Sequence, residues 1–317
     1  MFPASVHTLL RRAPALLAAV SAYAHGSALP PDVPEPEIAD ADPVIEPPRP
    51  QHVATAWPPD RLAVTDQLWG EGFTWPGGEV EMMRLAHPLG LSSAASLLLV
   101  EAGGGGAAAC IARNLGAWVT GLEVEPELVA QAHTVIKRAQ LGKRATVQPW
   151  NPLEPDMPAH QYHHCLAIEP LRCGGEPATI LNSMVHSLKV GGQLVMTELC
   201  ADVPLPADDP KVARWSKLEH RALSTLRPAK AITRMLSRVG FDVRVAEDVS
   251  VRHIENALIG WRVAVRELHR RKPSPVMTAR FVAEAEIWLL RVNLMHQNRL
   301  RMMRWHAISN ARAMPRS

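Results

Sequence analysis

Two carboxylates and a run of glycines have the spacing of a nucleotide-binding turn. The run Gly103–Gly106 follows Glu101, and Glu123 comes about 20 residues after it, at the end of the next apolar stretch. Glycine allows the backbone to approach a ligand closely, and a carboxylate at the position of Glu123 can accept hydrogen bonds from both hydroxyls of a ribose. We therefore expect the ligand to contact Glu101, Gly103, Gly105, Glu123 and Val124.

Glu169 and His253 are the side chains best placed to move a proton. Each follows an apolar stretch, and both residue types serve as general acids and bases. Glu169 can orient an amine or act as a base, but it can equally pair with Arg172 or cap the next helix. His253 can equally be a solvent-facing helix residue, and Glu198 is a further carboxylate candidate.

Histidines and cysteines gather between residues 160 and 173, which first suggests metal ligands. Cys165 begins an apolar strand, where adjacent side chains point to opposite faces, and the spacing matches no standard zinc pattern. We expect no metal site from this cluster, which consists of His160, His163, His164, Cys165 and Cys173.

Alternating strands and helices are expected to position these residues. Residues 97–100 are apolar throughout, as is typical of a parallel strand buried on both faces, and a helical run follows at 107–115. Residues 177–188 should form a helix that Gly191 or Gly192 ends in a left-handed conformation. The other expected strands are 117–122, 145–148, 165–169, 193–198, one from 241 onward, and an antiparallel strand at 300–308. The pattern predicts an α/β fold with a doubly wound, seven-stranded Rossmann-like sheet.

The Glu-x-Gly-x-Gly turn and the segment 119–126 resemble the class I S-adenosylmethionine-dependent methyltransferases. A dehydrogenase would instead carry Gly-x-Gly-x-x-Gly. The resemblance implies S-adenosylmethionine as the cofactor, with Glu101 facing its positively charged methionine end. The interval from Glu101 to Glu123 is one or two residues shorter than the family pattern, which leaves the register of the glycines open.

The family usually has an acidic residue after the third strand, which accepts a hydrogen bond from the adenine amino group. Here the segment 148–152 contains Trp150 and Asn151 instead. Asn151 can accept through its amide oxygen, and Trp150 can stack on the ring or simply pack at the edge of the core.

A loop rich in glycine and aromatic residues, 68–78, precedes the first strand. It resembles the lid segment of phosphoethanolamine N-methyltransferases and related small-molecule methyltransferases. The resemblance implies that Phe73, Thr74, Trp75 and Gly77 cover the cofactor and line the substrate cavity. Thr65 stands where those enzymes carry a tyrosine, so their tyrosine-based catalysis is not transferred to this chain.

The charge balance and the cysteines limit the classes of partner. Thirty-four basic and 31 acidic side chains give a net charge of +3, which offers no reason to expect nucleic acid. The four cysteines lie in expected core elements, so we expect them reduced in the cytoplasm. Residues 284–304 mix arginines with apolar residues and can contact a membrane surface or an acidic substrate, but packing of the apolar stripe is favoured.

The first 50 residues are expected to lie outside the folded core. Residues 1–28 imitate a secretory signal, although their apolar run is too short to span a bilayer. Prolines and acidic residues fill 29–50 and predict an extended linker.

We expect a cytoplasmic methyltransferase that modifies a small molecule at nitrogen or oxygen. The alternative is a catalytically degenerate protein that keeps the fold as a binding or assembly subunit, and a dehydrogenase is a distant third. The expected divisions are a tail and linker (1–50), an N-terminal lid (51–90), the S-adenosylmethionine-binding core (91–250), a helical insertion (251–298), and a closing strand with a tail (299–317).

Overall fold

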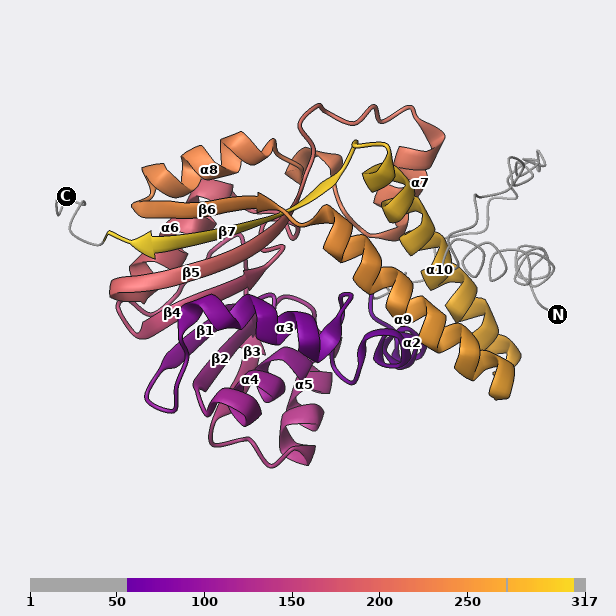
Figure 1. Ribbon diagram of the computed structural model, residues 1–317, viewed down its shortest axis with the longest axis horizontal. Helices are drawn as coiled ribbons and strands as arrows, with labels where there is room; N and C mark the ends of the chain where they lie inside the picture. The colour runs from indigo at the N-terminus through magenta and orange to yellow at the C-terminus, as the bar shows by residue number, and fades with distance from the viewer. Residues whose placement is uncertain (1–55, 272, 311–317) are drawn as a thin grey trace, which may run out of the picture.

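The computed structural model describes residues 56–271 and 273–310, which form a sheet covered by helices on both faces (Figure 1). The expected tail and linker at 1–50, the first five residues of the expected lid and the end of the expected tail lie outside the described residues.

The sheet has seven strands in the order β3-β2-β1-β4-β5-β7-β6; β7 runs antiparallel to both of its neighbours, β5 and β6, and the other neighbouring strands are parallel. This is the doubly wound, seven-stranded sheet that the sequence predicts. The strands are β1 (Ser96–Val100), β2 (Trp118–Glu123), β3 (Ala145–Pro149), β4 (Tyr162–Ile168), β5 (Leu188–Cys200), β6 (Phe241–Asp248) and β7 (Arg301–Ser309).

The central strand β1 is apolar throughout because both of its faces are covered. Leu97 and Leu99 pack into one hydrophobic cluster, while Leu98 and Val100 pack into a second cluster on the opposite face. All four side chains are fully buried. The first cluster includes side chains from α3 (Gly78–Ala86), α4 (Gly106–Leu115) and α5 (Pro126–Arg138). The second includes side chains from α6 (Pro177–Ser187) and α8 (Ala229–Arg238).

Two long helices are inserted between β6 and β7 and pack against the N-terminal helix. They are α9 (Ser250–Arg270) and α10 (Pro275–His296), and they lie beside α2 (Pro59–Trp69) at the carboxyl ends of the parallel strands (Figure 1). A shorter helix, α7 (Pro210–Leu218), contacts α10 from the other side. The short 3-10 helices are η1 (His87–Leu89) and η2 (Leu223–Thr225).

The turn between α6 and β5 differs from the prediction. Helix α6 ends at Ser187, and Leu188 is already extended, with φ of −85° and ψ of 143°. Gly191 does have a positive φ of 72°, but it lies within the long strand β5 rather than at the end of the helix. The prediction of a glycine-ended helix was therefore wrong.

Among residues 56–271 and 273–310, no helix is both long and apolar enough to cross a membrane.

Candidate active site

Three predicted carboxylates meet where β1, β2 and β4 end. Glu101 follows β1, Glu123 ends β2, and Glu169 follows β4; because these strands are parallel neighbours, their side chains reach one cavity. The cavity has a volume of about 50 Å³. All three glutamates are buried. Other residues in the lining are Trp57, Thr74, Trp75, Leu128, Arg172 and Cys173.

Glu123 is held rigidly by backbone groups of the glycine turn. Its Oε2 accepts a hydrogen bond from the Gly103 N–H (2.7 Å), and its Oε1 accepts one from the Glu125 N–H (3.0 Å). Burial raises the pKa of Glu123, and these two N–H groups oppose that effect. Each carboxylate oxygen has a second lone pair, so Glu123 can still accept hydrogen bonds from a ligand.

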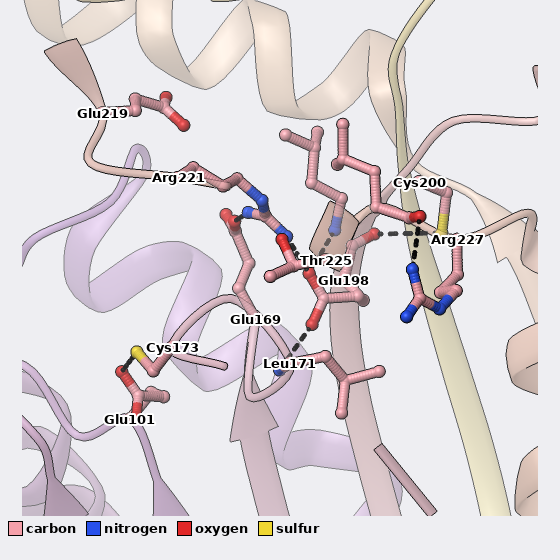
Figure 2. A network of polar contacts seen from close by, with 12 residues as sticks. Glu101, Glu169, Leu171, Cys173, Glu198, Cys200, Glu219, Arg221, Thr225 and Arg227 are labelled. Atoms are coloured by element: carbon pink, nitrogen blue, oxygen red, sulfur yellow. Dashed lines mark hydrogen bonds and ion pairs between the residues drawn. The ribbon is translucent and has the colours of Figure 1, made fainter. Parts of the chain in front are cut away.

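Glu101 has an unsatisfied oxygen. Its Oε2 accepts a hydrogen bond from the Cys173 thiol at 3.2 Å, as Figure 2 shows, while the buried Oε1 has no partner among the described residues. Glu101 also has a φ of 59°, a conformation that is uncommon outside glycine and concentrated at functional sites. Burial, and then the charge of Glu123, raise its pKa well above the usual range. A bound cation would satisfy this oxygen and favour the ionised carboxylate.

The lid lies directly on the glycine turn. The Gly72 carbonyl accepts a hydrogen bond from the Gly106 N–H at 3.1 Å, and the Gly72 N–H donates to Asp66. A Cβ on Gly103 would lie 3.0 Å from Thr74 Oγ1 and 3.3 Å from the Trp75 ring. The predicted lid residues Thr74 and Trp75 therefore cover the predicted turn, and Gly77 caps the start of α3.

A second, mainly apolar cavity of about 30 Å³ adjoins the first. Both cavities are lined by Trp75, Ile168 and Glu169. The second also contains His253, whose buried Nε2 has no partner among the described residues and whose ring lies 5.8 Å from that of Trp288. Burial, followed by the charge of Arg291, lowers the pKa of His253 to about 3, so its imidazole is neutral. His253 is thus not a solvent-facing helix residue, although it was predicted as one alternative.

Glu169 is bound by two distant arginines. Its carboxylate pairs with Arg221, from the loop after α7, and with Arg291 on α10. Arg221 also pairs with Glu198 at the end of β5, as Figure 2 shows, and Arg291 pairs with Glu219. Burial would raise the pKa of Glu169, but the charges of Arg291 and Arg221 lower it well below the usual range. With both oxygens paired and this pKa, Glu169 is a poor base.

Arg221 could not be expected here from the sequence, because 52 residues separate it from Glu169. In the sequence, Arg291 is only one of several arginines in the stretch 284–304, which also contains apolar residues. The alternative pairing of Glu169 with Arg172 forms neither a hydrogen bond nor a salt bridge between the described side chains, although the charge of Arg172 helps to lower the pKa of Glu169.

Four residues predicted to contact the cofactor lie away from the cavity lining. Trp150 packs in the second hydrophobic cluster, and Val124 packs against it. Asn151 is exposed, and its Oδ1 accepts a hydrogen bond from the Leu153 N–H at 3.1 Å. Gly105 serves packing between helices, since a Cβ there would lie 2.6 Å from Cα of Ala132 on α5.

The cluster for which we expect no metal is divided between the two ends of β4, with His163 and His164 near its start and Cys173 in the lining of the first cavity. His163 accepts a hydrogen bond from the Ser96 N–H at 3.0 Å. Among the residues that the structure describes, no three His, Cys, Asp or Glu side chains are grouped to hold a metal ion.

A larger, open groove of about 490 Å³ lies between α5 and β3 and includes Lys137, Lys143 and Arg144. The groove lies apart from the three glutamates.

No protein-family model and no curated protein matches the sequence. Solved structures do match. Phosphoethanolamine N-methyltransferase 2 of Haemonchus contortus, in complex with phosphomonomethylethanolamine and S-adenosylhomocysteine, aligns with a TM-score of 0.69 at 16% identity over 80% of this chain. The chain spans only 58% of that enzyme, and 56% in a second structure of it with S-adenosyl-L-methionine.

Two further structures match at a TM-score of 0.61. One is a putative sarcosine dimethylglycine methyltransferase from Galdieria sulphuraria, 16% identical over 79% of this chain and 99% of that one. The other is the [4+2]-cyclase SpnF, 20% identical over 79% of this chain and 92% of that one. The strand order, the glycine turn and these likenesses agree: the chain has the fold of the class I S-adenosylmethionine-dependent methyltransferases.

Proposed function

We propose that the chain is an S-adenosylmethionine-dependent methyltransferase that modifies a small molecule at nitrogen or oxygen. The observation that carries the proposal is the unpartnered, buried Oε1 of Glu101, beside the glycine turn and in the same cavity as Glu123. A buried carboxylate oxygen without a partner is costly unless a ligand satisfies it. The cationic methionine end of S-adenosylmethionine has the required charge, and Glu123 offers acceptors for the ribose hydroxyls.

The second cavity is the proposed site of the methyl acceptor. S-Adenosylmethionine supplies an electrophilic methyl group, so the protein has to align the acceptor and take its proton. The two cavities meet at Trp75, Ile168 and Glu169, which is where an in-line transfer would take place. His253 lines the acceptor cavity, and its neutral Nε2 has no partner among the described residues, so it is the group proposed to orient the acceptor by a hydrogen bond; with a pKa of about 3 it is itself a weak base. Glu169, paired with Arg221 and Arg291, is proposed as a positioning residue rather than as the base.

The test is calorimetric titration of the full chain with S-adenosylhomocysteine, S-adenosylmethionine and, separately, NAD. We expect micromolar binding of the two adenosyl ligands and none of NAD. Glu123→Ala should abolish binding, because it removes the acceptors for the ribose. Glu154→Ala is the matched control, since Glu154 is exposed and far from the glycine turn in sequence. A folded wild-type protein that binds neither adenosyl ligand would contradict the proposal.

The second candidate function is that of a degenerate, noncatalytic binding subunit. The specific observation in its favour is the size of the cavities, about 50 and 30 Å³, compared with about 300–1,000 Å³ for a typical ligand pocket. Methyl transfer to a panel of amines and phenols separates the candidates. Cofactor binding without transfer to any acceptor would favour the binding subunit, and transfer that is lost in His253→Gln would favour the enzyme.

A further inference from the structure

The second cavity offers a ligand no unpaired charge. Its lining contains two carboxylates, Glu81 and Glu169, and among the described residues it contains no lysine or arginine. Both oxygens of Glu81 are bound, Oε1 by Arg252 at 3.0 Å and Oε2 by Arg84 at 3.1 Å. Both oxygens of Glu169 also pair with arginines. A charged group that entered this cavity would therefore be buried without a free counter-ion, which is costly for either sign of charge.

Two neutral ring nitrogens in the same lining have no partner. They are the indole Nε1 of Trp75 and the imidazole Nε2 of His253; both atoms are buried, and neither forms a hydrogen bond with a described residue. The indole N–H can only donate, whereas Nε2 of a neutral imidazole accepts or donates according to its tautomer. Buried polar atoms of this kind are normally satisfied, so a ligand is expected to supply the missing partners.

A hydroxyl group matches these two nitrogens. Its oxygen can accept from the Trp75 N–H, and its proton or its second lone pair suits either tautomer of His253. An ammonium has no lone pair with which to accept from Trp75. The rest of the lining is mostly apolar, which favours a hydrocarbon or aromatic body on the ligand; the apolar residues are Pro76, Leu85, Ile168, Val249 and Met302.

We propose that the methyl acceptor is a neutral, largely apolar molecule whose hydroxyl group binds between Trp75 and His253 and is methylated at oxygen. The inference rests on the proposed function and narrows it, because it excludes acceptors that carry an ammonium or a phosphate. Trp75 lines both cavities, so a hydroxyl bound to it lies on the side of the cofactor. The oxygen forms a bond to the methyl carbon as the carbon–sulfur bond breaks. The electron pair stays on sulfur, which leaves S-adenosylhomocysteine, and the hydroxyl proton is released to water.

The test compares small probes of similar size on the full chain loaded with S-adenosylhomocysteine. Phenol and benzyl alcohol carry a neutral hydroxyl, toluene carries none, benzylamine carries an ammonium and phenyl phosphate an anion. Ligand-observed NMR titration measures each Kd. We expect a Kd of about 1 mM for the two hydroxyl probes. Toluene should bind about tenfold more weakly, because both ring nitrogens stay unpartnered, and the two charged probes should bind more weakly still.

Two variants each remove one ring nitrogen and keep an apolar aromatic ring. Trp75→Phe and His253→Phe should each weaken phenol by about 3- to 10-fold and leave toluene unchanged, so that the difference between the two probes narrows. Binding of S-adenosylhomocysteine shows that each variant is folded. Trp118→Phe and His269→Phe are the matched controls, because both residues are exposed and neither lines a cavity of the site. They should bind every probe as the wild type does.

The outcomes separate the acceptor class from the proposed function. If S-adenosylhomocysteine binds but phenol and toluene bind equally, or their difference survives in both variants, the hydroxyl site is wrong and the proposed function stands. Transfer of a labelled methyl group from S-adenosylmethionine to benzylamine or phosphoethanolamine would also overturn the acceptor class, while it would support the methyltransferase. If the folded wild type binds no adenosyl ligand, both proposals fail.

Discussion

Glu101 combines burial with an unpartnered oxygen, and this combination predicts a proton change on cofactor binding. Burial, and then the charge of Glu123, raise its pKa well above the usual range, which favours the protonated carboxyl in the free protein. An ammonium group favours the ionised form, so binding should release that proton and strengthen as the pH rises. Calorimetry in buffers of different ionisation enthalpy measures the release, and Glu101→Gln should abolish it. An equal release from the variant would assign the proton to another group.

His253 should make the stability of the protein depend on pH. Its folded pKa of about 3 lies below the value of about 6.5 for an unfolded chain, so the unfolded state gains a proton first. The free energy of unfolding therefore decreases as the pH falls below about 6.5, and it keeps decreasing until about pH 3. Arg291 and Glu169, which act on His253, keep their charges through most of this range.

The measurement for His253 is urea unfolding of the wild type and His253→Gln at several pH values. Between neutral pH and about pH 5, the wild type should lose about 2 kcal/mol more of its free energy of unfolding than the variant does. Parallel pH profiles for the two proteins would show that His253 is not buried as a neutral side chain.

Individual residues could be located from the sequence where their position follows local order, while their binding of the cofactor stays a prediction. Glu101 and Glu123 were identified because each ends a strand that leads into a tight turn, and Trp75 because it lies in a glycine-rich loop. Trp150 was ambiguous, since an aromatic residue at the end of a strand can face a ligand or the core with the same local sequence. Only the packing of the neighbouring helices decides between the two, and it places Trp150 in the core.

The lid lies this close to the glycine turn because Gly72 has no side chain. A Cβ on Gly72 would lie 2.6 Å from the Gly104 carbonyl oxygen and 2.6 Å from the Gly106 nitrogen. Gly72→Ala should therefore hold the lid off the glycine turn and weaken S-adenosylhomocysteine by about tenfold, equivalent to about 1.4 kcal/mol of lost contact. Gly90→Ala is a matched control: Gly90 shares a positive φ, of 58° against 75°, but a Cβ there meets nothing within 4 Å.

Both glycine variants should lose about 1–3 kcal/mol of stability from the strained backbone, and only Gly72→Ala should lose affinity. Calorimetry and urea unfolding of the same samples give the two quantities. Equal affinity in both variants would mean that the lid contributes nothing to binding.

The ion network joins the loop after α7 to the ends of β4 and β5. Arg221 is 2% exposed and neutralises Glu169 and Glu198 together. Arg221→Ala leaves two buried carboxylates with fewer partners, and it should lower the free energy of unfolding by about 3–5 kcal/mol. Arg214→Ala breaks a surface pair and should cost less than about 1 kcal/mol. A similar loss in both variants, measured by urea unfolding, would contradict the structural role of the network.

The order of elements along the chain could be predicted because strand and helix patterns are local. The ends of elements were less certain: Gly191 and Gly192 suggested the end of a helix, yet the pairing of Leu188 with Tyr162 of β4 extends β5 back to Leu188. The ion network could not be predicted at all. Its members come from segments up to 122 residues apart, and only the folded insertion brings Arg291 to Glu169.

The whole site is assembled from three separate parts of the chain. The sheet edge supplies the glutamates, the N-terminal lid covers the glycine turn, and the insertion supplies His253 and Arg291. A cavity of about 50 Å³ between these parts is too small for the proposed cofactor, so the parts must move to admit it and pack on it afterwards. Cofactor binding should thus increase the protection from hydrogen exchange in all three parts and not in the sheet edge alone.

Hydrogen exchange with and without saturating S-adenosylhomocysteine tests this expectation. At about 100 times its Kd, a ligand stabilises the folded state by about 2.7 kcal/mol, which is enough to slow exchange markedly in segments that open locally. Protection should increase in the lid, the two turns after β1 and β2, and the segment after β4, while α8 and β6, on the far side of the sheet, should change little. The expected segments are 70–78, 101–106, 123–128 and 168–173. Protection centred instead on 140–146, in the basic groove between α5 and β3, would place the adenosyl ligand outside the proposed site.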